Sequence, residues 1–69
     1  MRNNTFIVDG MGGEDCEMLV EKTLKSLAGV RSAEADYLQG IVDVTYDEQA
    51  VTPAEMQEAL DEAGYDMEI

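Results

Sequence analysis

The chain has 69 residues, which is enough for one hydrophobic core, so we expect a single domain that spans residues 1–69. Sixteen acidic residues against four basic ones give a formal net charge of −12 at pH 7, and the chain has no histidine. A negative charge of this size repels phosphate backbones, which argues against nucleic acid as a ligand, and the lack of histidine excludes metal ligation by imidazole.

The first half of the chain predicts a strand followed by a helix. Residues 4–9 are rich in β-branched and aromatic side chains, with Phe6 and Val8 on one face, and Gly10 ends this run. Helical spacing then extends from about Glu14 to Ala28, and Gly29 follows as a stop signal. The positions at this spacing are Cys16, Leu19, Val20, Thr23, Leu24 and Leu27.

The second half predicts a hairpin, a second helix and a short last strand. Two alternating runs flank Gln39 and Gly40, and their apolar members are Ala33, Ala35 and Tyr37, then Val42, Val44 and Tyr46. The second helix opens with Thr52 as N-cap, Pro53 at the first helical position and Glu55 in a capping box. Its buried stripe is Met56, Ala59, Leu60 and Ala63, before Gly64. Tyr65, Met67 and Ile69 then alternate with acids as a terminal strand.

The order strand, helix, strand, strand, helix, strand predicts an α+β fold. Two βαβ units of this kind place both helices on one face of a four-stranded antiparallel sheet. We therefore expect a ferredoxin-like βαββαβ sandwich.

Four segments carry a resemblance to a known family and together cover nearly the whole chain: "FIVDGM", "CEMLVEKTLKSLAGVRSAEAD", "GIVDVTYD" and "VTPAEMQEALDEAGYDMEI". They resemble the heavy-metal-associated domain family, which includes soluble copper and mercury carriers and the N-terminal modules of metal-transporting P-type ATPases. The resemblance implies a loop of the form Met-x-Cys-x-x-Cys whose two thiolates hold a soft metal ion. Met11 and Cys16 fall on the Met and the second Cys of that motif, whereas Gly13 stands at the first Cys.

Cys16 is therefore the candidate metal ligand, in a site with one sulfur instead of two. Thiolate sulfur favours Cu(I), with Zn(II) or another heavy metal as further candidates. Three arrangements could complete the coordination: a Cys16-mediated dimer, a sulfur supplied by a partner protein or a small thiol, or oxygen ligands from Asp15 or Glu14. The two carboxylates also have a purely structural interpretation as favourable charges at a helix start.

The rest of the loop is expected to support the site. Met11 is interpreted as a core plug beneath the loop rather than a thioether ligand. The family resemblance implies that Tyr65 lies close to the metal loop. Gly10, Gly12 and Gly13 are expected to adopt positive backbone dihedrals and to make the loop mobile.

Two function hypotheses follow. The first is a small copper-chaperone-like domain for metal ion transport or trafficking, whose partner, by family resemblance, is a metal-transporting ATPase or another metal-handling protein. The alternative is a degenerate protein-interaction module that keeps the fold and binds no metal. An enzyme is not expected, because the spacing suggests no pair of nucleophile and base.

Cysteine content, hydropathy and charge also bear on the compartment. A lone cysteine cannot form an intramolecular disulfide, which favours a reducing compartment, and no apolar run is long enough for membrane insertion. We expect a cytoplasmic protein. The acidic residues predict either an ordinary solvated surface or an adaptation to a high-salt, halophilic cytoplasm.

Overall fold

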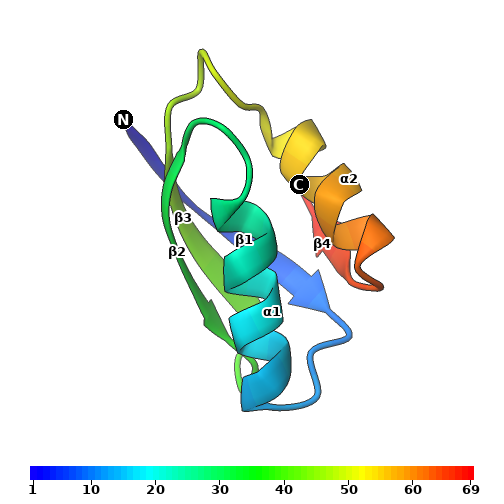
Figure 1. The fold of residues 1–69 in the computed structure, drawn as a ribbon. Coiled ribbons are helices and arrows are strands. Elements are labelled where there is room, and N and C mark those ends of the chain that lie inside the picture. Colours follow the sequence, from blue (N-terminus) through cyan, green and yellow to red (C-terminus); the bar gives the residue numbers. More distant parts are fainter.

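The computed structural model describes all 69 residues and has one four-stranded sheet with two helices (Figure 1). The elements in chain order are β1 (Arg2–Asp9), α1 (Glu14–Lys25), β2 (Val30–Asp36), β3 (Ile41–Tyr46), α2 (Pro53–Glu62) and β4 (Asp66–Glu68). The sheet order is β2-β3-β1-β4, and every neighbouring pair is antiparallel. Figure 1 shows both helices on the same face of the sheet. The predicted ferredoxin-like α+β fold is confirmed.

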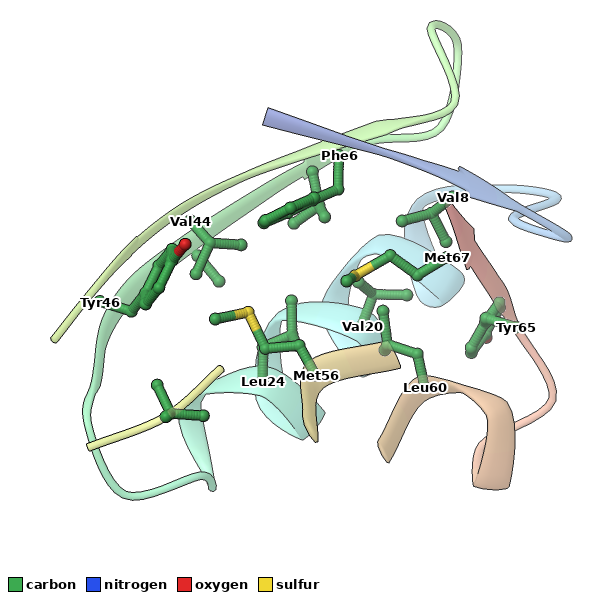
Figure 2. Close-up of a cluster of buried hydrophobic side chains, with 13 residues drawn as sticks. Phe6, Val8, Val20, Leu24, Val44, Tyr46, Met56, Leu60, Tyr65 and Met67 are labelled. Atoms are coloured by element: carbon green, nitrogen blue, oxygen red, sulfur yellow. The ribbon is translucent and has the colours of Figure 1, made fainter. Parts of the chain in front are cut away.

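The core lies between the sheet and the two helices (Figure 2). Alternate residues of the strands point into it, and the register places Phe6 opposite Val42 and Val8 opposite Met67. The fully buried helix residues are Val20 and Leu24 of α1 and Met56 and Leu60 of α2. Each such side chain contributes about 1.5–3 kcal/mol of burial free energy, so packing alone holds the fold without a disulfide.

Helix α1 is shorter than its sequence pattern predicts. It ends at Lys25 instead of Ala28, with Ser26 as C-cap, and the Ser26 hydroxyl donates to the Thr23 carbonyl at 2.6 Å. The chain then turns through Gly29, which has φ +96°. The apolar positions at helical spacing are also not all buried, because Leu19 is 45% exposed. Leu19 lies about 100° around the helix from Val20, which takes the position facing the sheet.

Helix α2 begins as predicted. Thr52 is its N-cap, the Thr52 hydroxyl accepts from the Glu55 N–H at 3.3 Å, and Pro53 is the first helical residue. At the other end the helix stops at Glu62, and the last strand is short. Ile69 lies beyond that strand and is 70% exposed, so it does not continue the buried alternation of Tyr65 and Met67.

No helix of the structure has both the length and the apolar character needed to cross a bilayer.

Candidate metal centre

The candidate site lies at the connection between β1 and α1. β1 ends at Asp9, the loop 10–13 follows, and Cys16 is the third residue of α1. Tyr65, from the junction between α2 and β4, reaches the same end of the molecule. Its ring lies beside the loop, because a Cβ placed on Gly10 would be 3.6 Å from Tyr65 Cδ1. The topology thus brings residues 16 and 65 together, as the sequence resemblance implied.

The surroundings of Cys16 stabilise its thiolate. The side chain is half-buried and is a free thiol. The pKa of Cys16 is lowered below its ordinary value, first by a hydrogen bond from the Tyr65 hydroxyl and then by the backbone N–H groups of Gly12 and Gly13. Desolvation and the charge of Asp15 act in the opposite direction without reversing the shift. A larger fraction of Cys16 is therefore ionised at neutral pH than in an ordinary cysteine, and the thiolate is the form that binds a metal ion.

Tyr65 responds in the opposite sense. Its pKa is raised above the ordinary value, chiefly because its hydroxyl is hydrogen-bonded to Cys16, with burial and the charge of Cys16 as further causes. Tyr65 is only 8% exposed, and Figure 2 shows its ring at the margin of the core cluster. In this pair the proton stays on the phenol oxygen and the charge develops on sulfur.

The two acids of the first turn lie beside the thiol. Glu14 and Asp15 are exposed and line the same depression as Cys16. The structure contains no group of three or more Cys, Asp or Glu side chains that could hold a metal ion. Both acids also lie where the helix dipole favours negative charge, and ligation by either one stays a prediction.

The loop residues differ in their structural demands. Met11 is partly buried and packs against the core cluster, as a core plug would. Gly10 has φ +104°, in the left-handed region that favours glycine, but Gly12 and Gly13 lie outside that region. The expectation that all three glycines adopt such dihedrals is therefore wrong. A Cβ at Gly13 would meet no atom within 4 Å, and its φ of 175° is extended backbone open to any residue.

Two hydrogen bonds from the helix that carries Cys16 were not predicted from the sequence. Glu17, the residue after Cys16, accepts a hydrogen bond from the Tyr37 backbone N–H at 2.8 Å, and Glu21 accepts one from Ala35 N–H at 2.9 Å. The only sequence signal was two glutamates four residues apart on one flank of the helix, which is also the pattern of an ordinary exposed face. Which N–H groups these glutamates bind depends on how the helix packs on the sheet.

The fold and the loop together define the class of protein. It is a ferredoxin-like domain whose distinctive chemistry is one activated thiol, in an open depression lined by residues 12–16 at the start of the first helix.

Comparisons with known proteins identify the family. The family model for the heavy-metal-associated domain matches residues 5–66. The copper chaperone CopZ of Staphylococcus haemolyticus (strain JCSC1435) is 42% identical over 67 residues, which cover 97% of this chain and 98% of that protein. The chain belongs to the heavy-metal-associated domain family, and the resemblance stated from sequence is confirmed.

Solved structures agree with this assignment. A CopZ metallochaperone superposes with a TM-score of 0.92 at 33% identity, covering 97% of this chain and all (100%) of that one. A copper-binding domain from HMA7, a P-type ATPase, superposes with a TM-score of 0.95 at 33% identity, covering 100% of this chain and 93% of that one. Both single carriers and ATPase modules are thus among the structural relatives.

Proposed function

We propose that this domain carries a soft metal ion on Cys16 and exchanges it with the thiolates of a metal-handling partner. The observation that carries the proposal is the thiol itself: Cys16, in the first turn of α1, lines an open depression, its pKa is lowered, and hydrogen-bond donors from Tyr65 and the loop backbone stabilise its thiolate. Binding replaces the thiol proton by the metal ion. Transfer then exchanges one sulfur ligand for another and requires no change of oxidation state.

Cu(I) is the ion that the site suits best. Zn(II) takes four ligands in structural sites, whereas this chain offers one sulfur and no group of three or more Cys, Asp or Glu side chains that could hold a metal ion. Soft thiolate ligands select Cu(I), and a two-coordinate thiolate complex would need only one further sulfur. The names of the relatives, copper chaperones and copper-binding ATPase domains, support the same ion.

The missing sulfur must come from outside the chain. A second copy is the least favourable source in dilute buffer, because each copy carries a formal charge of −12 and the loop itself bears Glu14 and Asp15. A cysteine of a partner with a neutral or basic docking face, or a small cellular thiol, meets no such repulsion. Among such partners we prefer a metal-transporting ATPase, because ATPase modules belong to the same family. The free thiol of Cys16 favours a reducing cytoplasm.

A competitive titration of the reduced protein with Cu(I) tests the proposal. Wild type should bind weakly alone and more tightly when a small monothiol is added, whereas Cys16→Ser should lose both. A variant combining Cys16→Ser with Ser32→Cys is the matched control, because it moves the thiol to an exposed position on β2. If Cys16→Ser binds as tightly as wild type, or the relocated thiol binds equally well, the loop is not a metal site.

A second candidate function rests on Gly13 and on the charge. A family member that lacks the first motif cysteine and carries a strongly acidic surface could serve as a docking module for a basic protein. This function predicts a salt-sensitive complex that is unchanged in Cys16→Ser. The carrier function predicts a complex that is stabilised by Cu(I) and lost in that variant.

A further inference from the structure

Strand β2 is held to α1 by hydrogen bonds that strand pairing does not supply. β2 is an edge strand and pairs only with β3. The N–H groups of Ala35 and Tyr37 donate instead to Glu21 Oε2 and Glu17 Oε2, at 2.9 and 2.8 Å, in partly buried positions. Two carboxylates of the helix thus occupy donors that an adjacent strand would otherwise take.

The spacing of the two contacts fixes the helix along the strand. Glu17 and Glu21 are four residues apart, a rise of about 6 Å in a helix. Tyr37, the first residue after β2, lies two residues beyond Ala35 in the opposite direction, a separation of at most about 6.8 Å. The two distances match for one alignment only, so a displacement of α1 along β2 by one residue would break both hydrogen bonds.

The first turn of α1 has no side-chain cap, and it is held by backbone hydrogen bonds to the Gly13 carbonyl and by the packing of Cys16 on the core. Its N-cap is Gly13, which offers no side-chain hydrogen bond. Glu17 is the next residue after Cys16 and links this turn to the start of the connection between β2 and β3. That connection lies beside the first turn of the helix in Figure 1.

We infer that Glu17 is a positioning residue for the metal site: by accepting from Tyr37 N–H it holds the first turn of α1, and with it Cys16 Sγ, in one orientation toward an incoming ligand. The inference rests on the proposed function of Cys16. Glu17 is not proposed as a ligand, because its carboxylate accepts from the Tyr37 N–H. Glu21 makes the same kind of contact one turn farther from the thiol and mainly anchors the helix body.

Three variants separate positioning from charge. Glu17→Ala removes the acceptor, and Glu17→Gln removes the charge but keeps an acceptor oxygen. Glu21→Ala removes an equal charge together with the contact farther from the thiol. Circular dichroism and unfolding curves establish that each variant is folded.

Two measurements read the effect. In the metal-free protein, Glu17→Ala should make the Tyr37 amide exchange about tenfold faster relative to amides of β3, and Cys16 should react severalfold faster with a bulky neutral thiol reagent. With Cu(I) and a small monothiol, the same variant should bind about tenfold more weakly. Glu17→Gln should restore most of both, whereas Glu21→Ala should leave Cys16 close to wild type.

The inference is overturned if Glu17→Ala leaves Cys16 reactivity and Tyr37 exchange unchanged, or if Glu21→Ala has the same effect on Cys16 as Glu17→Ala. It is also overturned if the Gln and Ala variants of Glu17 behave alike. A wild-type protein that binds no metal would contradict the proposed function alone, because the two metal-free readouts would still show whether Glu17 orients the thiol.

Discussion

The Tyr65 hydroxyl and the Cys16 thiol come from opposite halves of the chain and meet at the loop between β1 and α1. The hydroxyl is the largest cause of the lowered pKa of Cys16. Tyr65 is positioned there by the end of α2, where Gly64 has φ +95° and Tyr65 N–H donates to the Leu60 carbonyl at 2.8 Å. A residue of the second βαβ half therefore lowers the pKa of the cysteine in the first half.

Tyr65→Phe should raise the pKa of Cys16 toward its ordinary value. The ring and its packing remain, but the hydroxyl that stabilises the thiolate is lost, so a smaller fraction of Cys16 is ionised at neutral pH. The pH dependence of alkylation by iodoacetamide measures this, and its midpoint should move to higher pH. Tyr37→Phe is the matched control and should leave the midpoint in place. An unchanged midpoint in Tyr65→Phe would show that the hydroxyl does not act on the thiol.

Gly13→Cys should convert the one-sulfur site into a chelating pair. The backbone at Gly13 is extended, and a Cβ there meets no atom within 4 Å, so the new side chain costs little stability. Two thiolates held together should raise Cu(I) affinity about a hundredfold or more, because the second ligand binds intramolecularly. Competition with a chromophoric Cu(I) chelator measures the gain.

Gly12→Cys provides the control for Gly13→Cys. It adds a thiol to the same loop at an equally open position but with a different spacing to Cys16. Equal affinities for the two variants, or no gain for Gly13→Cys, would contradict the view that only the first ligand is missing from this site.

Gly29→Ala should destabilise the fold at the turn between α1 and β2. Gly29 has φ +96°, and an added Cβ would lie 2.7 Å from the Ala50 Cβ. The combined strain should lower the free energy of unfolding by about 1–3 kcal/mol, read from urea unfolding at unchanged m-value. Gly12→Ala, with open space around it, should stay within about 0.5 kcal/mol of wild type. Equal stability of the two variants would refute this account of the turn.

Asp66→Asn should stabilise the protein at low salt. The sheet register places Asp9 opposite Asp66, and Glu34 opposite Asp43, as like-charged pairs on neighbouring strands. Relieving one pair should increase the free energy of unfolding by about 0.2–1 kcal/mol. The gain should vanish at molar salt, where the Debye length is about 3 Å.

The control for charge is Glu55→Gln, which removes an acid from the favourable first turn of α2 and should give no gain. Stability of wild type that rises with salt would favour the high-salt alternative over an ordinary solvated acidic surface. A gain for Asp66→Asn that is the same at molar salt would show that repulsion across the strands is not its cause.

The fold could be predicted because its signals are local. Thr52 and Pro53 mark the start of α2, and alternation around Gly40 marks the hairpin. The end of α1 could not be placed, because the pattern continues to Leu27 while the backbone leaves the helix at Ser26. At the site, a resemblance was enough to place Cys16 and Tyr65. The contact of Glu17 with Tyr37 depends on how a helix lies on a strand, which no local pattern records.

The central claim is that Cys16 binds Cu(I) with a sulfur supplied from outside the chain. Mass spectrometry of the reduced protein under non-denaturing conditions, with Cu(I) and a small monothiol, reads metal, thiol and subunit number together. We predict a monomer carrying one Cu(I) and one monothiol, absent in Cys16→Ser. A metal-free monomer under all these conditions, or the same adduct in Cys16→Ser, would contradict the account.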